Sequence, residues 1–244
     1  MIVAGLINSA LLMIAINNSE PRKTGCGIYL INTSITTLFT MIIFLLKFPI
    51  LIIAQKTYIT NRLFLQLQCT SIDFLLRIGL NMDQSLSACI VIERAVAPIK
   101  GTSFNKKKSK EMVKYIILIL LILNIGTIIH VPIHRHLIND DDDDDSEKRI
   151  WCIVTYSSSL QTFNTVVNIF HFLTPFIINL ISGPIIIVMT ARQRTTVRIH
   201  ESYRNILYQQ FEQHSHLLIT PIVLVILAIP PLIISFILTL YEVN

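Results

Sequence analysis

The stretch that decides the fold is CTSIDFLLRIGLNMDQSLSACIVIER, residues 69–94. It begins with Cys69 and ends with the charged pair Glu93 and Arg94, twenty-five residue steps later. A helix rises about 1.5 Å per residue, so it covers this separation in roughly 37 Å, slightly more than the roughly 30 Å of bilayer hydrocarbon. We therefore expect one membrane-spanning helix that holds a cysteine at one face of the bilayer and an acid–arginine pair at the other.

The composition of the whole chain also indicates a membrane protein. Of its 244 residues, 52% are hydrophobic and only 14% are charged, whereas soluble domains carry about 25% charged residues. The apolar residues come in long blocks and not in the alternation of a half-buried strand. The sequence predicts an all-α, polytopic transmembrane bundle that forms a single domain over residues 1–244. The six predicted spans are residues 2–17, 28–54, 66–92, 113–133, 163–190 and 217–240.

The basic residues predict the orientation of the bundle in the plasma membrane. Thirteen Lys and Arg fall in the loops after the first, third and fifth spans, and five fall on the other side. Cytoplasmic loops carry the excess of basic residues, so both termini of the chain should be extracellular. Cys69 and Cys152 then lie on the outer side, where disulfides persist. The first span is short enough for a signal peptide, but it lacks a basic start and is predicted to be retained.

An acidic run, Asp140–Asp145, falls in the predicted outer loop before Cys152. Six like charges repel one another, which favours a solvated segment. Alternatives are the attraction of a cationic ligand, such as a basic peptide, and a calcium site, although the spaced oxygens and turn glycine of a calcium loop are missing. The sequence predicts no metal or cofactor and no enzyme, because it contains no zinc-ligand spacing and no nucleophile–base arrangement.

Polar residues recur inside two spans at helical spacing, so each set shares one helix face. The set in the third span is Asp73, Arg77, Asn81, Gln84 and Ser87, and that in the fifth is Asn164, Asn168, His171, Pro175, Asn179 and Ser182. Asp73 and Arg77 are one turn apart, so they either pair with each other or contact a ligand at the floor of an outer pocket. The polar face of the fifth span either holds helices together or lines the same pocket.

Further residues of the spans predict an ion or proton site and helix kinks. Asp83 is expected inside the hydrocarbon, where a carboxylate either takes up a proton or belongs to an ion site. Pro175, Pro230 and Pro231 are predicted helix kinks, because proline removes a backbone hydrogen bond.

Taken together, these features resemble a rhodopsin-like (class A) G-protein-coupled receptor of a divergent invertebrate, orphan type. The resemblance covers nearly the whole chain. The matching residues are Asn8 in GLINSALL, YLINTSITTL at residues 29–38, Cys69, Cys152, Glu93-Arg94-Ala95, Pro175 and Pro230.

The resemblance implies a function for several of these residues. Cys69 and Cys152 should form a disulfide. Glu93 should hold Arg94 in the resting state. Once released, Arg94 should contact a heterotrimeric G protein on the cytoplasmic side. Ala95 is the third residue of this motif. The implied pocket for an extracellular ligand, with a peptide among the candidates, is lined by Asp73, Leu76, Arg77, Asn81, Asn164, Asn168 and His171.

The chain also departs from the pattern of this family. Thr37 replaces the acid of the second helix, which puts the usual sodium site in doubt, whereas Asp83 falls at a position that lines that site. Leu76 stands where amine receptors place an aspartate, which argues against a biogenic amine. No seventh span follows Tyr241–Asn244, so we expect a receptor truncated before its last helix, as a fragment, a mispredicted gene model or a decayed copy.

Two alternatives from other classes of membrane protein remain open. One is a six-span transporter or channel that uses Lys47, Asp73, Arg77 and Asp83 as a charged path, although no repeated half is visible. The other is a membrane protein that does not signal. The sequence identifies neither the ligand nor the G-protein subtype.

Overall fold

The computed structural model describes residues 25–55, 62–101, 105–139, 150–197 and 203–214, together with residues 219, 222, 223 and 226. Within this part of the chain, four helices are long and apolar enough to cross a membrane. The predicted class, a helical transmembrane bundle, is therefore confirmed. The predicted span 2–17, almost all of the span 217–240, the acidic run Asp140–Asp145, and Pro230 and Pro231 lie outside the described residues.

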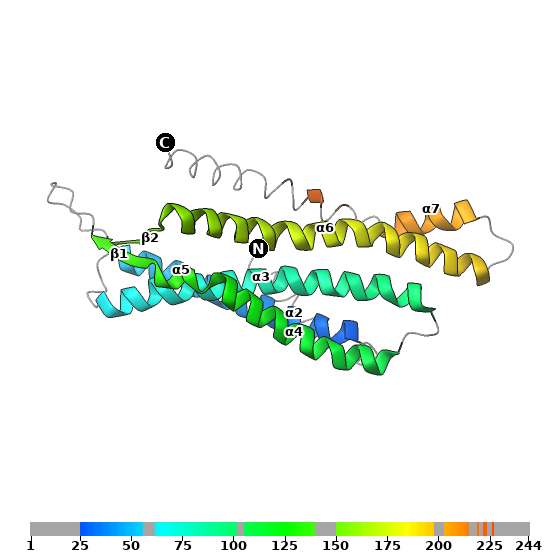
Figure 1. Ribbon diagram of the computed structural model, residues 1–244, viewed down its shortest axis with the longest axis horizontal. Coiled ribbons are helices and arrows are strands. Elements are labelled where there is room, and N and C mark those ends of the chain that lie inside the picture. Colours follow the sequence, from blue (N-terminus) through cyan, green and yellow to red (C-terminus); the bar gives the residue numbers. More distant parts are fainter. Residues whose placement is uncertain are drawn as a thin grey trace.

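Helix α3 is the centre of the bundle and contains the stretch 69–94 quoted above. It contacts α2, α4, α5, α6 and the strand β1. Figure 1 shows α3 and α4 crossing each other alongside α6, with the hairpin of β1 and β2 at one end of the molecule and α7 beside α6 at the other. The elements are α2 Gly25–Gln55, α3 Arg62–Lys100, α4 Lys106–Ile128, α5 His130–Ile133, β1 Arg135–Asn139, β2 Ile150–Val154, α6 Ser158–Val197 and α7 Tyr203–His214.

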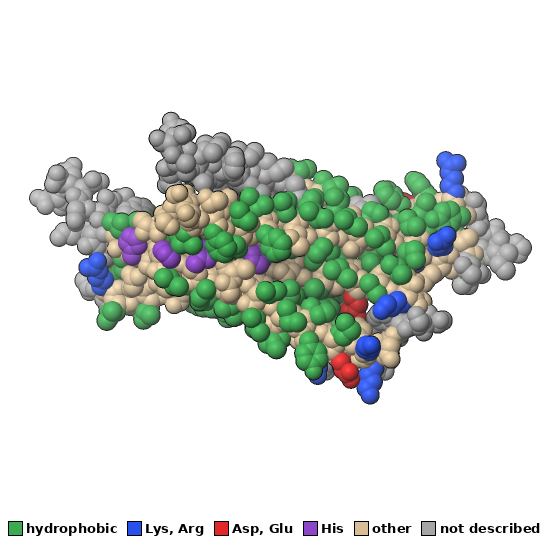
Figure 2. Space-filling view, viewed as in Figure 1, with side chains coloured by type: hydrophobic (Ala, Val, Ile, Leu, Met, Phe, Trp, Pro, Cys, Tyr) green, Lys and Arg blue, Asp and Glu red, His purple; other side chains and the backbone are tan. Residues whose placement is uncertain are grey.

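The surface of the bundle is apolar, as expected where lipid replaces water. Leu46 of α2, Ile122 of α4 and Phe170 of α6 are among many large hydrophobic side chains that point outward, and Figure 2 shows such side chains along most of the length of the molecule. The buried core that joins α2, α3 and α4 contains Tyr29, Met82, Leu86, Ile90 and Val113. Since apolar contact with lipid is as favourable as apolar contact with a neighbouring helix, association of these helices depends on close packing and polar contacts.

A glycine permits the closest approach between α2 and α3. A Cβ atom added to Gly79 of α3 would overlap the Oγ1 atom of Thr40 on α2. Small residues allow helix backbones to come together in this way in membranes. Gly25 plays the same part at the start of α2, where an added Cβ would lie 2.5 Å from both Glu93 Oε1 and Ser109 Oγ.

The segment 101–110, which lies in the basic loop predicted between the third and fourth spans, is a loop only in part. Gly101, with φ of 50°, ends α3 in the left-handed region that favours glycine. Asn105 caps α4, and its side-chain oxygen accepts hydrogen bonds from the backbone nitrogens of Lys107 and Lys108 at 3.1 Å. Lys106–Lys110 therefore form the first turns of a helix, because an asparagine cap starts a helix even where lysines oppose the helix dipole.

The strands β1 and β2 were not predicted. They pair antiparallel, with Leu137 opposite Cys152. Helix α6 continues through Pro175 and Pro184, and α2 continues through Pro49. Proline is tolerated inside these helices because neighbouring groups in a bundle can satisfy the freed carbonyls.

Candidate functional site

The disulfide between Cys69 and Cys152 marks one end of the bundle, which we call the disulfide end. Its two Cα atoms lie 5.8 Å apart, and the bond joins α3 to β2 across 83 residues of sequence. The pairing expected from the resemblance is therefore present. It fixes the hairpin of β1 and β2 against the first turns of α3, so that residues of the hairpin reach the polar face of this helix.

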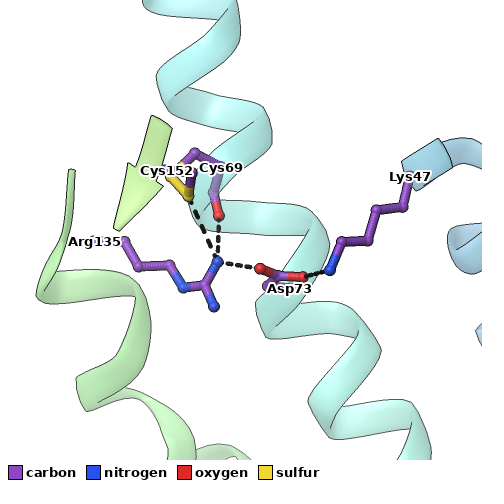
Figure 3. A network of polar contacts seen from close by, with 5 residues as sticks. All are labelled: Lys47, Cys69, Asp73, Arg135 and Cys152. Carbon is purple, nitrogen blue, oxygen red and sulfur yellow. Dashed lines mark hydrogen bonds and ion pairs between the residues drawn. A yellow bond between two sulfur atoms is a disulfide. The ribbon is translucent and has the colours of Figure 1, made fainter. Parts of the chain in front are cut away.

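Asp73 lies at the centre of a network of charges next to the disulfide. Its carboxylate pairs with the guanidinium of Arg135 on β1 and, at 2.5 Å, with the ammonium of Lys47 on α2. The same Arg135 nitrogen also donates to the backbone oxygen of Cys69 at 3.2 Å and contacts the sulfur of Cys152 at 3.7 Å. Figure 3 shows Asp73 between its two cationic partners. The network connects three elements: α2, α3 and the hairpin.

Asp73 and Arg77 were expected either to pair with each other or to contact a ligand, and no ion pair joins them among the described contacts. Arg77 points instead to α6, where its Nη1 atom donates to Asn164 Oδ1 at 3.4 Å. The ring of His130 on α5 is 3.3 Å from the same oxygen. Partners on other helices compete with a partner one turn away, and only the packing of the bundle decides between them. Arg77, His130 and Asn164 form a polar group brought together from three elements, which we call the Arg77 cluster.

Tyr156, in the short connection between β2 and α6, covers this cluster. Its ring lies 5.8 Å from the rings of both His130 and His134. Burial raises the pKa of the Tyr156 phenol, and the positive charges of Arg77 and Arg135 offset this only in part. The phenol is therefore protonated at neutral pH, and its buried oxygen has no hydrogen-bond partner among the described residues.

Other residues of the predicted pocket are less closely associated with the cluster. His171 interacts with Thr127 of α4 at 2.9 Å and not with Arg77. Leu76 and Asn81 are half-buried on α3, whereas Asn168 is exposed on α6. Gln84, which belongs to the polar set predicted in the third span, is exposed as well. The polar faces read from the sequence are thus only partly directed inward, since a regular spacing gives a shared face but not the direction in which it points.

Asp83 has a hydrogen-bond partner on a neighbouring helix. Thr37 of α2 donates a hydrogen bond to Asp83 Oδ1 at 2.9 Å. Thr37 stands where the resemblance expects an acid in the second helix, and the hydrogen bond brings this position into contact with Asp83. Among the described residues, no three His, Cys, Asp or Glu side chains gather as metal ligands.

The opposite end of the bundle, which we call the basic end, contains Lys100 and Lys106–Lys110 next to Glu93 and Arg94. Figure 2 shows most of the Lys and Arg side chains of the visible face gathered at this end. Arg94 is exposed and Ala95 is buried. Glu93 Oε1 accepts a hydrogen bond of 2.6 Å from Ser109 of α4, so the carboxylate that was expected to hold Arg94 is bound to a neighbouring helix instead.

Four residues of these networks were absent from the predicted pocket: Lys47, His130, Arg135 and Tyr156. Tyr156 closely follows Cys152 in the sequence, so a disulfide between Cys152 and the start of α3 was a usable signal for Tyr156. Arg135 lies 17 residues before Cys152 and comes near it only because β1 pairs with β2. Nothing in the sequence indicated His130, which depends on how α4 and α5 meet α6.

Comparison with known proteins gives one finding at the level of the family. The family model of the 7 transmembrane receptor (rhodopsin family) matches residues 7–244. None of the curated proteins matches the chain.

Proposed function

Because the chain belongs to the rhodopsin family of seven-transmembrane receptors, we propose that it binds a ligand at its disulfide end and activates a heterotrimeric G protein at its basic end. The observation that supports this proposal is that helix α3 connects the two ends of the bundle. It forms the disulfide through Cys69 and has an exposed Arg94 near its other end. The disulfide end then faces the outside of the plasma membrane, as the positive-inside rule also favours.

The mechanism we propose is a shift between two arrangements of the helices. A ligand that binds one arrangement better moves the population toward it, by no more than its difference in affinity allows. Arg94 is the contact for the G protein. Since Glu93 is hydrogen-bonded to Ser109, its part is to couple α3 to α4 and not to cover Arg94.

The charges at the disulfide end support a ligand with an acidic group. Asp73 is already paired with both Lys47 and Arg135, so it has little capacity left for a cationic ligand. Among the described residues, the hydrogen bonding of Arg77 is limited to one long bond to Asn164. A guanidinium binds a carboxylate through two parallel hydrogen bonds, and it does so more strongly where water is excluded.

Tyr156 adds a second donor for the same acidic group. Its protonated, buried phenol lacks a partner among the described residues, and an unmet buried hydroxyl costs about 1–3 kcal/mol. A ligand carboxylate between Arg77 and Tyr156 would satisfy both. The C-terminal carboxylate of a peptide fits this chemistry, whereas an amine does not, in agreement with Leu76 at the position of the amine-receptor aspartate.

The test is ligand-dependent nucleotide exchange by G proteins in membranes that contain the full chain. The probes are short peptides with a free C-terminal carboxylate and the same peptides as C-terminal amides. We expect the carboxylate forms alone to stimulate exchange, and Arg77→Gln to abolish the difference. Arg94→Glu should abolish stimulation while peptide binding persists, and Lys107→Glu is the control for a charge reversal at the basic end.

The outcomes separate the ligand class from the signalling function. Stimulation by the amides as strongly as by the carboxylates would contradict the acidic ligand and leave the receptor function standing. Peptide binding with no exchange on any G protein would favour a membrane protein that does not signal. Unchanged stimulation in Arg94→Glu would contradict the role of Arg94.

A further inference from the structure

A cavity of about 760 Å³ lies at the basic end, between α2, α3 and α4. Pockets for small molecules measure roughly 300–1,000 Å³. Tyr29 and Val113 line it and are almost completely buried, at 3% and 2% exposure. Ile92 and Met112 also line it and are 42% and 52% exposed, so the cavity is open toward the apolar surface of the bundle. A molecule dissolved in the bilayer can therefore enter it from the side.

The polar lining of the cavity is concentrated where α3 ends and α4 begins. Lys100 is the last residue of α3 and Lys108 lies in the first turn of α4. Glu93 lines the cavity as well. One of its carboxylate oxygens accepts from Ser109, but the other is buried and has no partner among the described residues. A ligand that fits this lining carries an anionic group, a hydrogen-bond donor and an apolar chain.

We propose that this cavity binds an anionic phospholipid of the membrane whose headgroup also carries a donor, as phosphatidylserine does. Its phosphate and carboxylate lie by Lys100 and Lys108, since basic residues at a membrane surface attract anionic lipid. Its ammonium donates to the unpartnered oxygen of Glu93, because a buried carboxylate oxygen without a donor is unfavourable. The acyl chain leaves along Ile92 and Met112. This lipid site does not depend on the proposed signalling function.

Cys89 provides a direct readout, because its half-buried thiol lines the same cavity. The Cys26→Ser variant leaves Cys89 as the one cysteine outside the disulfide. This chain is placed in nanodiscs of phosphatidylcholine with increasing phosphatidylserine, and alkylation of Cys89 by N-ethylmaleimide is followed by intact mass. We expect phosphatidylserine to slow the alkylation. Lys100→Ala with Lys108→Ala should raise the phosphatidylserine needed for half protection by about 10- to 30-fold.

The matched control is Lys107→Ala with Lys110→Ala, which removes the same charge from exposed lysines that do not line the cavity. If both double variants weaken the protection equally, the effect is general surface charge and the proposal is overturned. Protection by pure phosphatidylcholine to the same degree, or no protection by either lipid, also overturns it.

A second measurement keeps the proposal testable if the lysine variants fail to fold. Native mass spectrometry counts the phosphatidylserine that remains on the protein after extraction from mixed nanodiscs. Val96→Trp fills the cavity, which Val96 lines, and should reduce the retained phosphatidylserine several-fold. Val166→Trp places the same side chain on the exposed surface of α6 and should retain the wild-type amount. Equal retention by the two variants would contradict a site in this cavity.

Discussion

At the scale of single residues, Asp73 is the side chain whose ion pairs are expected to matter most for stability. It joins Lys47 of α2 and Arg135 of β1 through one carboxylate. The Arg135 side chain is only 9% exposed, whereas that of Lys47 is 36% exposed. Loss of the carboxylate would therefore leave one nearly buried guanidinium without its counter-charge, and an uncompensated buried charge is among the costliest local changes in a protein.

We predict that Asp73→Asn destabilises the chain by about 2–3 kcal/mol, below the full cost of a fully buried ion pair because Asp73 is 23% exposed. The measurement is thermal unfolding in nanodiscs. The control is Asp83→Asn on the same helix, whose described contact is a hydrogen bond from Thr37 that an asparagine oxygen can also accept. Equal shifts in the melting temperatures of the two variants would mean that the ion pairs of Asp73 add no stability.

At the scale of elements, the contact of α2 with α3 depends on the absence of a side chain at Gly79. A helix in lipid gains little from apolar packing alone, so the gain from close approach and polar contact determines whether two helices associate. Thr40, on which the approach centres, also donates to the backbone oxygen of Thr36 at 2.8 Å. Its hydroxyl is therefore held in the position where a new methyl group would meet it.

We predict that Gly79→Ala costs about 1–3 kcal/mol of stability, because α2 and α3 must separate to admit the methyl group. The addition of Thr40→Ala should recover part of the loss. Gly126→Ala on α4 is the matched control, since nothing lies within 4 Å of an added Cβ there; it should be neutral or slightly stabilising. The measurement is the melting temperature of each of the three variants. An unchanged melting temperature in Gly79→Ala would contradict the close packing of α2 against α3.

At the scale of the whole molecule, the disulfide ties the hairpin to the bundle and brings Arg135 and Tyr156 over the polar face of α3. A bond that closes a loop of this length stabilises a soluble chain by about 4 kcal/mol in the chain-entropy account. Helices already held in a bilayer have less freedom to lose, so a smaller contribution is expected here. The main effect of the disulfide is to position the hairpin, because the networks of Asp73 and of Arg77 both depend on where the hairpin lies.

We predict that Cys152→Ser lowers the stability by about 2 kcal/mol and exposes the strands β1 and β2 to proteases. A reducing agent should bring the wild-type melting temperature to that of the variant. Cys26→Ser, which removes a cysteine outside the disulfide, should leave both properties unchanged. Protease resistance of the hairpin in Cys152→Ser would show that the charge network alone holds it in place.

The sequence by itself determined the transmembrane class and the layout of the central helix. Apolar length and the rise of 1.5 Å per residue are local properties, so Cys69 and Arg94 could be assigned to opposite ends of one helix before any contact was known. The start of α4 was also locally encoded, in Asn105, although the run of lysines obscured it.

Only the tertiary structure decided which polar groups meet. Asp73 pairs with Lys47 and Arg135 and not with its neighbour Arg77. Glu93 accepts a hydrogen bond from Ser109 and not from Arg94. Thr37 donates to Asp83 on the neighbouring helix. For Asp73 and Glu93, a partner nearby in sequence competed with one distant in sequence. Spacing fixes which residues share a face of a helix, but the rotation of that helix and the close approach allowed at Gly79 determine what the face meets.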